Sequence, residues 1–383
     1  MSTELPGRDE LSKYVKVTAA RLHRVRMPLV HAFRTSSHRK TQLDHILVEL
    51  EDASGAIGWG EIASPSDPYY APETVETCWH IAEHHLLPAV LGKPWERPEQ
   101  VAQLWAKVRG NQFAKAGVDV AAWVLWAAVH EVPLAQALGG TRGEVIAGVS
   151  LGIEPTIGDL LTEVRRQVAA GYPRIKLKIA PGWDVEPVRA VRADFPDLDL
   201  HVDANGIYTE SIEHLTALRA LDEFELTMIE QPFAPRNLLA HARLQPHLVT
   251  PICLDESVET LDDLETALSI EALRVLNIKV SRMGGLTAAR AAHDRAQQAG
   301  IPVWCGGMHE FGIGRAANVA LSSLPGFTLP SDVSASEKYY ARDLINPPVS
   351  AEHGVVQVPK ASGLGHTVDT ELIAANTVAT LSF

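Results

Sequence analysis

The sequence predicts an α/β fold, a (β/α)8 TIM-type barrel that follows an N-terminal α+β capping domain. From about residue 146, eight short runs rich in β-branched residues alternate with amphipathic stretches. Polar residues near the ends of these runs recur every 24 to 27 residues, from Lys178 to Lys279. Eight strand-helix units over roughly 190 residues fit a closed parallel barrel, whose active residues lie at the C-terminal strand ends. An open doubly wound sheet is the alternative, but no glycine-rich phosphate loop follows the first run.

The first part of the chain has a different pattern. Residues 15–62 carry strand signals, and a turn at 52–55 separates two apolar runs, as in an antiparallel hairpin. Residues 72–138 show helical spacing and are followed by a pair of glycines, which suits a helix C-terminus. We therefore expect a capping domain at residues 1–140, the barrel at 141–336, and a C-terminal segment at 337–383 that packs back on the capping domain.

Composition limits the classes of partner. The 383 residues are 46% hydrophobic and carry a net charge of -13, which argues against binding nucleic acid or acidic membranes. The polar start of the chain lacks the apolar core of a signal peptide, and no apolar run reaches the ~18 residues that span a bilayer. We expect a cytoplasmic homo-oligomer that acts on a small molecule. The three cysteines lie far apart among apolar neighbours, which favours buried thiols over disulfides or a zinc site.

Two lysines on one strand require an explanation. In residues 174–180, Lys176 and Lys178 alternate with apolar residues, so both point to the same face of the strand. Either this is an exposed edge strand with solvated lysines, or the two ammonium groups face a functional interior. Lys279 ends the sixth run, and the second and sixth strands of an eight-stranded barrel lie opposite each other. The second interpretation therefore predicts lysines that face each other across the barrel mouth.

Three carboxylates end the strands between those lysines: Asp203 on the third strand, Glu230 on the fourth and Asp255 on the fifth. A single Asp at a strand end is usually a turn or helix-cap residue. Three carboxylates on consecutive strands instead indicate a metal site, and an all-oxygen ligand set suits Mg²⁺ or Mn²⁺, whereas zinc prefers His or Cys. A metal ion, desolvation and a second ammonium would each lower a lysine pKa toward that of a base at neutral pH.

These residues and several short motifs together resemble the enolase superfamily, and within it the muconate-lactonising subgroup. The resemblance covers nearly the whole chain and rests on the motifs MPLVHAFRTS, GWGEIASPSDPYY, KLK, VDANG, IEQP, LDES, NIKVSRMGG, CGGM and SDVSAS. The segments AFRTS, SPSDPYYAPE, RAANVALSSLP and DVSAS are most similar to o-succinylbenzoate synthases that also racemise N-acylamino acids. The resemblance implies magnesium-dependent removal of a proton α to a carboxylate, followed by dehydration or racemisation, in the context of menaquinone biosynthesis.

By this resemblance, the three carboxylates are the metal ligands, and Lys178 is the base on one face of the substrate. Lys279 acts from the opposite face, as a cation that stabilises the intermediate in a synthase or as the second acid or base in a racemase. Lys176 supports Lys178 and helps to neutralise the substrate carboxylate. Which of the two outcomes is physiological stays open.

The substrate contacts are expected on the capping domain and on the last strands. Capping loops around Phe33 and Tyr70 should close over the barrel mouth. Arg282 matches an arginine of the racemising members and would lower the pKa of Lys279; a surface arginine that opens the next helix is the alternative. The remaining expected contacts are Asn205, Gly306, Gly307, Met308, His309 and Glu310.

Other subgroups fit less well. Dipeptide epimerases carry Asp-X-Asp on the eighth strand, where this chain has Pro330, Ser331 and Asp332. Mandelate racemases use a His on the seventh strand, but a lysine on the sixth makes His309 a pocket residue rather than a base. The segment MHEFG departs from the family pattern at His309 and Phe311, which points to a divergent specificity. Another cycloisomerase or epimerase, or a catalytically silent barrel that binds a carboxylate, is the alternative function.

Overall fold

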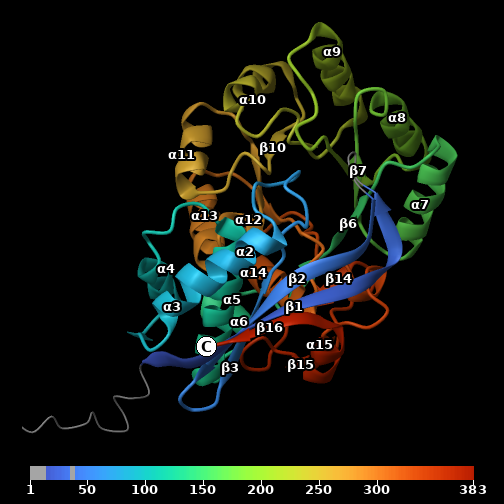
Figure 1. The fold of residues 1–383 in the computed structure, drawn as a ribbon. Helices are drawn as coiled ribbons and strands as arrows, with labels where there is room; N and C mark the ends of the chain where they lie inside the picture. The colour runs from blue at the N-terminus through green and yellow to red at the C-terminus, as the bar shows by residue number, and fades with distance from the viewer. Residues whose placement is uncertain (1–13, 35–38) are drawn as a thin grey trace, which may run out of the picture.

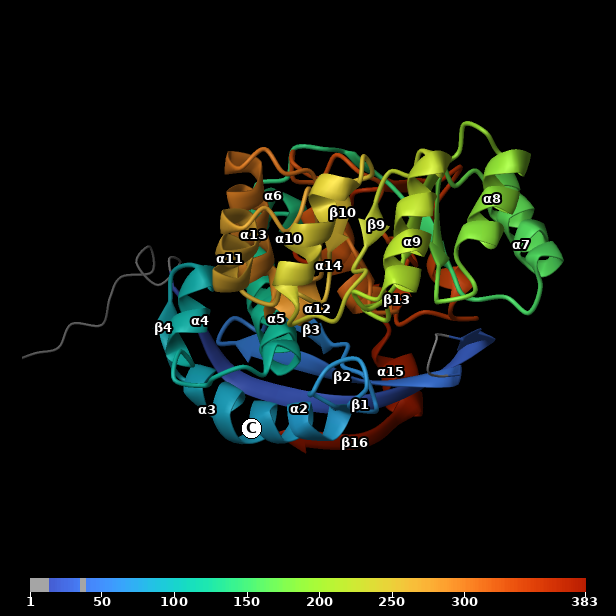
Figure 2. The same cartoon turned by 90° about the horizontal axis from the view of Figure 1, so that it is seen from above.

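The centre of the capping domain is an antiparallel sheet. The structure, a computed structural model, describes residues 14–34 and 39–383, and the side chains of residues 32–40 lie outside that description. The strand order is β16-β1-β2-β3. The strands are β1 (Val15–Arg34), β2 (Arg39–Asp52), β3 (Ile57–Ile62) and β16 (Thr377–Ser382), and β4 (Pro94–Trp95) pairs with β1. Figure 2 shows this sheet on one side of the molecule and the barrel helices on the other.

The turn between β2 and β3 confirms the predicted hairpin. The carboxylate of Asp52 accepts hydrogen bonds from the amides of Ser54 and Ala56. Gly55 adopts a φ of 85°, which a residue with a side chain rarely adopts.

Strand β2 is buried on both faces because its alternate residues serve two cores. Leu43 and Leu47 pack in the core that includes the barrel, whereas Ile46, Val48 and Leu50 pack against the helices of the capping domain. The sheet is therefore one of the layers through which the two parts of the chain contact each other.

Helices pack on the face of this sheet that carries Ile46, Val48 and Leu50, as the helical spacing of residues 72–138 predicts. The longest, α5, packs on β3, where a side chain on Gly58 or Gly60 would collide with the backbone of α5 at Ala121 or Gly117. These helices are α2 (Val75–Ile81), α3 (Leu87–Val90), α4 (Val101–Leu104), α5 (Gln112–Val129) and α6 (Leu134–Leu138), with the π-helical turn η1 (Ala82–Leu86) and the 3-10 turn η2 (Pro98–Gln100).

The second half of the chain forms a curled parallel sheet of seven strands, which confirms the predicted barrel fold. The strands are β6 (Gly148–Leu151), β7 (Arg174–Lys178), β8 (Asp199–Asp203), β9 (Ile229–Glu230), β10 (Ile252–Leu254), β11 (Val275–Ile278) and β12 (Val303–Cys305). All seven pair in sequence order, so their C-terminal ends meet at one edge.

The eighth predicted strand differs from the expectation. The segment 327–333 forms single bridges, Val303 to Phe327 on one side and Ala147 to Ser331 on the other, instead of a regular strand. Pro330 has no amide hydrogen to donate to a ladder, and its carbonyl accepts a hydrogen bond from the side chain of Arg174. The segment closes the ring between the first and seventh strands without forming continuous pairs.

The predicted alternation of strands and helices is also confirmed. Side chains of Thr156, Ser211 and Thr260 cap three of these helices at their N-termini. Figure 1 shows α7 to α11 and α13 in an arc outside the strands. The helices are α7 (Ile157–Ala169), α8 (Val185–Asp194), α9 (Ile212–Ala220), α10 (Leu238–Leu244), α11 (Leu261–Ser269), α12 (Val280–Met283), α13 (Leu286–Gln298) and α14 (Gly312–Ser322), with 3-10 turns η3 (Leu221–Phe224) and η4 (Gln245–His247).

The last part of the chain contacts both the barrel and the capping sheet. β14 pairs with β5, just before the first barrel strand, and β16 pairs with β1. The elements not yet named are β5 (Glu144–Ile146), η5 (Ser336–Lys338), β13 (Ile345–Asn346), β14 (Val355–Gln357), β15 (Thr367–Val368) and α15 (Thr370–Asn376). The domain boundaries at 140 and 336 stay a prediction. Among the described residues, no helix combines the length and apolarity that crossing a membrane requires.

Candidate active site

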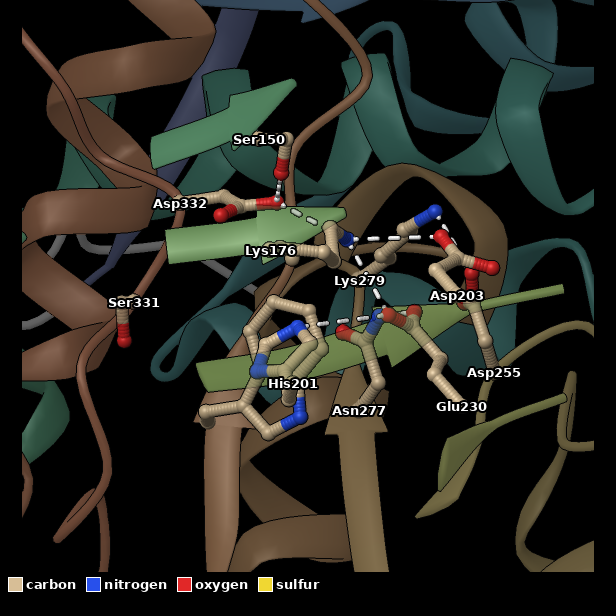
Figure 3. A network of polar contacts seen from close by, with 12 residues as sticks. Ser150, Lys176, His201, Asp203, Glu230, Asp255, Asn277, Lys279, Ser331 and Asp332 are labelled. Carbon is tan, nitrogen blue, oxygen red and sulfur yellow. Dashed lines mark hydrogen bonds and ion pairs between the residues drawn. The ribbon is translucent and has the colours of Figure 1, made fainter. Parts of the chain in front are cut away.

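The strand ends bring the six predicted charged residues to one edge of the barrel. Lys176 and Lys178 lie in β7, Asp203 and Glu230 end β8 and β9, and Asp255 and Lys279 directly follow β10 and β11. Parallel pairing puts these ends side by side, for example Lys178 beside Asp203, and Asp203 beside Glu230. Figure 3 shows five of the six side chains converging from neighbouring strands. The interpretation of Lys176 and Lys178 as solvated residues of an edge strand is therefore wrong.

Lys178 bonds to two groups of the next strand. Its ammonium lies 2.5 Å from the carboxylate of Asp203 and donates a hydrogen bond to the side-chain oxygen of Asn205 at 2.6 Å. The amide group of Asn205 in turn donates to Glu256 at 2.9 Å. Burial raises the pKa of Asp203, but the ammonium groups of Lys178 and Lys176 outweigh burial and hold that pKa below its usual value.

Lys176 lies deeper and is surrounded by carboxylates. Its Nζ is 3.1 Å from Glu230 and 3.2 Å from Asp332, and it sits over the ring of Trp304 at 4.7 Å from the centroid. Burial lowers the pKa of Lys176, but the surrounding carboxylates, Asp332 first, raise it above its usual value. Lys176 is therefore a fixed positive charge inside the barrel (Figure 3).

Lys279 approaches from the other side of the carboxylates. Its Nζ donates hydrogen bonds to Asp255 at 2.8 Å and to the hydroxyl of Tyr70 at 3.0 Å, so the capping loop does reach the barrel mouth. The groups around Lys279 act on its pKa in opposite directions. Burial and Arg282 do lower the pKa of Lys279, but Asp255, Tyr70 and Glu256 together raise it well above its usual value.

Arg282 is a buried partner of Asp255 rather than a surface residue. Its side chain forms an ion pair with Asp255 and donates to the carbonyls of Val258 at 3.1 Å and Asn277 at 2.8 Å, and the residue is 2% exposed. The alternative of an exposed arginine that opens a helix is therefore wrong. Arg282 and Lys279 occupy the two oxygens of one carboxylate.

The residues after β12 form a turn that passes close to Lys279. A Cβ on Gly306 would lie 2.8 Å from Cε of Lys279, so the absence of a side chain permits the approach. Gly307 lies beside the carboxylate of Glu310, and Met308 packs against the capping-domain core. The carbonyl of His309 accepts a hydrogen bond from Tyr340 at 2.6 Å. The side chain of Phe33 lies outside the described part of the structure, so its expected contact stays a prediction.

A second layer of polar residues was not predicted. Asp332 accepts hydrogen bonds from Arg174 at 2.8 Å and from Ser150 at 3.0 Å, next to Lys176 (Figure 3). His201 and Asn277 are also buried there, and Asn277 donates to Glu230 at 2.7 Å. A signal existed in the sequence: Arg174, His201 and Asn277 lie two residues before Lys176, Asp203 and Lys279, and positions two apart face the same side of a strand.

The three strand-end carboxylates suit a hard divalent cation in their chemistry. Among residues 14–34 and 39–383, no group of three or more His, Cys, Asp or Glu side chains is arranged to hold a metal ion as it stands. The carboxylates are instead paired with lysines. They nevertheless repel one another: burial, together with the charges of Asp203 and Asp255, raises the pKa of Glu230 to about 8. A cation of charge two among these oxygens would relieve that repulsion, so the donor set fits Mg²⁺ or Mn²⁺.

A barrel with lysines on opposite strands, carboxylates between them and a capping loop over its mouth defines a class of enzymes that remove a proton next to a carboxylate. Comparison with known families agrees. Residues 159–372 match the family of enolase C-terminal domain-like proteins, and residues 15–139 match the mandelate racemase / muconate lactonizing enzyme N-terminal domain. The chain therefore belongs to the mandelate racemase / muconate lactonizing enzyme family of the enolase superfamily.

The similar proteins include o-succinylbenzoate synthases and N-succinylamino acid racemases. An o-succinylbenzoate synthase from Geobacillus kaustophilus is 48% identical over 91% of this chain and 92% of its own length. An N-succinylamino acid racemase from Amycolatopsis sp is 43% identical over 95% of this chain and 98% of its own length. The crystal structure of an enolase superfamily member from Listeria innocua superposes with a TM-score of 0.93 at 37% identity, covering 96% of this chain and 99% of that one. The chain is thus an enzyme, and its relatives include both a synthase and a racemase.

Proposed function

We propose that this enzyme removes the proton α to the carboxylate of a small molecule and then either dehydrates it to o-succinylbenzoate or racemises N-succinylamino acids. Two relatives with these names, each at least 43% identical over nearly the whole chain, support both outcomes. A cytoplasmic location, a homo-oligomeric state and a place in menaquinone biosynthesis are part of the same proposal.

The observation that carries the proposal is the placement of Lys178 and Lys279 on opposite sides of the three carboxylates. Lys178 contacts Asp203 on β8, and Lys279 contacts Asp255 after β10, so a substrate held between them meets one amine on each face. Racemisation needs both: one lysine takes the α-proton and the other delivers a proton to the opposite face. In dehydration, Lys178 takes the proton and then protonates the departing hydroxyl on the same face.

Mg²⁺ or Mn²⁺ would be held by Asp203, Glu230 and Asp255, and when bound it stabilises the negative charge that develops on the substrate carboxylate. Lys176 keeps its proton because carboxylates surround it. It therefore contributes a fixed positive charge that helps to neutralise the substrate carboxylate. In the dehydration, the ammonium of Lys279 stabilises the ring system of the intermediate through a cation contact.

The capping domain completes the enclosure. The hydroxyl of Tyr70 accepts a hydrogen bond from Lys279, and the centroid of the Tyr70 ring lies 5.2 Å from the Lys279 ammonium. We assign Tyr70 and Phe33 to the wall that excludes water and selects the acyl group of the substrate. Asn205, Arg282 and the turn from Gly306 to Glu310 are assigned to the substrate side of the barrel.

The test follows the α-proton directly. The metal-loaded enzyme is incubated in D₂O with each enantiomer of an N-succinylamino acid, and the α-proton signal is followed by NMR while chiral chromatography measures both enantiomers. Exchange with appearance of the opposite enantiomer is expected. In a separate incubation with the β-hydroxy carboxylate that loses water to give o-succinylbenzoate, formation of that product is measured by absorbance. A barrel that only binds carboxylates gives neither exchange nor product. Absence of racemisation would overturn the racemase half of the proposal, and absence of o-succinylbenzoate would overturn the synthase half.

A further inference from the structure

The N-terminus of α14 obtains its cap from a different domain. The helix begins at Gly312, and the residue before it, Phe311, has no side-chain acceptor for the free amides of the first turn. Glu61, near the end of β3 in the capping domain, provides both acceptors. One carboxylate oxygen accepts from the amide of Phe311 at 2.8 Å and the other from the amide of Gly314 at 2.8 Å. Asp343 accepts from the amide of Gly312 at 2.7 Å.

His45 holds Glu61 in this position and also contacts the helix start. Its Nδ1 lies 2.6 Å from the carboxylate of Glu61, and its ring lies 4.6 Å from the ring of Phe311. Both His45 and Glu61 are buried. The approach requires Gly314, because a Cβ there would lie 2.9 Å from the Glu61 oxygen. Two residues of the capping domain therefore hold the start of α14. Glu61 binds its backbone amides, and His45 contacts the ring of Phe311.

The fixed helix start is the far end of the turn that passes Lys279. The turn runs from Gly306, which touches Lys279, to Phe311, which Glu61 binds. Within it, Gly307 lies against Glu310, and His309 has a left-handed φ of 62°. Close-packed contacts at both ends leave the turn little freedom, so a displacement at Phe311 would be passed to the backbone beside Lys279.

We propose that Glu61, held by His45, is a positioning residue that fixes the turn Gly306–Phe311 and thereby sets the enzyme's preference among substrate side chains. The inference rests on the proposed function. It gives the unusual Phe311 a role in the contact between the two domains instead of in the wall of the site. Glu61 touches neither the lysines nor the carboxylates of the site, so its effect is on the position of the turn rather than on proton transfer.

The test compares two variants of similar structural cost. Glu61→Gln keeps the size of the side chain but replaces one acceptor oxygen with a donor group, which faces an amide that also donates. The matched control is Asp119→Asn, because Asp119 in α5 caps another barrel helix from the capping domain and accepts from the amide of Thr287 at 3.0 Å. Both variants should lower the melting temperature. Only Glu61→Gln should change the ratio of kcat/KM between N-succinylalanine and N-succinylphenylalanine, by about fivefold and mainly through KM.

An unchanged ratio in Glu61→Gln, with a loss of melting temperature like that of the control, would show that Glu61 is only structural and would overturn the inference. If Glu61→Gln does not fold, Phe311→Leu decides, since it removes the ring contact with His45 and keeps the cap; the same change in ratio is expected. If the wild type exchanges no α-proton, the proposed function fails separately. The dissociation constants of the same two compounds, measured by calorimetry, then show whether Glu61→Gln changes their ratio.

Discussion

The two sides of the barrel mouth hold their lysines in different ways. Lys178 has a side chain that is 15% exposed, and it binds one carboxylate and one neutral amide. Lys279 is more deeply buried, and its partner Asp255 is shared with the buried Arg282, while Tyr70 adds a hydrogen bond from the capping domain. One amine thus lies in a partly open, lightly bonded position, and the other in a closed ionic network.

This difference indicates how one site could support two reactions. The proposed dehydration needs proton transfer only from Lys178, the less constrained amine, and uses Lys279 as a held cation. Racemisation requires Lys279 to exchange a proton as well, although its ionic network favours the protonated amine. Changes on the Lys279 side should therefore affect racemisation more than dehydration, and changes on the Lys178 side should affect both.

The largest expected effect comes from the lysines themselves. Lys178→Ala should reduce both dehydration and racemisation by about 10³-fold or more, because the general base is absent. Lys279→Ala should abolish racemisation but keep α-proton exchange for the one enantiomer whose proton faces Lys178. NMR in D₂O with each enantiomer separately measures this. Racemisation that persists in Lys279→Ala would contradict the assignment of the two faces.

Metal removal should abolish both reactions equally, since the ion belongs to neither side. Dialysis against a chelator is expected to stop turnover, and Mg²⁺ or Mn²⁺ should restore it, while Zn²⁺ should restore it poorly. Asp203→Asn should lose activity while circular dichroism shows an intact fold. Full turnover in excess chelator would remove the metal from the mechanism.

A smaller effect is expected at Arg282, on the Lys279 side. Arg282→Lys keeps the charge but loses the hydrogen bonds to the carbonyls of Val258 and Asn277, which would be left buried without that partner. The free energy of unfolding should fall by about 1–3 kcal/mol, measured with urea. Racemisation should fall by about tenfold and dehydration by less, because the disturbed ionic network contacts Lys279 and not Lys178. Equal losses in the two reactions would contradict the proposed difference between the two sides.

The smallest effect is expected from Tyr70→Phe, which removes one hydrogen bond from Lys279 and keeps the ring. Racemisation should fall by about two- to fivefold with dehydration nearly unchanged, in line with the loss of a single hydrogen bond. Tyr69→Phe is the matched control, because Tyr69 is the neighbouring residue and is 72% exposed. Tyr70→Ala should in addition change the preference among acyl groups. If the control and Tyr70→Phe behave alike, the contact with Lys279 has no role in catalysis.

Most of the fold could be predicted because strand and helix patterns are local. The hairpin at Asp52, the helices after residue 72 and the strand-helix repeat all follow from the spacing of apolar residues. The eighth strand could not be predicted in the same way, since its sequence resembles a strand. Whether it pairs regularly depends on Pro330, whose carbonyl accepts a hydrogen bond from the side chain of Arg174 in β7.

The sequence by itself determined which charged residues share a site, because parallel strands place their C-terminal ends at one edge and the interval between Lys178, Asp203, Glu230, Asp255 and Lys279 is that of one strand-helix unit. Only the tertiary structure decided how those charges are balanced. Burial at Lys279 favours the neutral amine, and the nearby Asp255 and Tyr70 reverse that preference. The binding of the α14 start by Glu61 was equally invisible, since the two residues in contact, Glu61 and Phe311, lie 250 positions apart. Electrostatic balance and domain contacts depend on distances that no local pattern encodes.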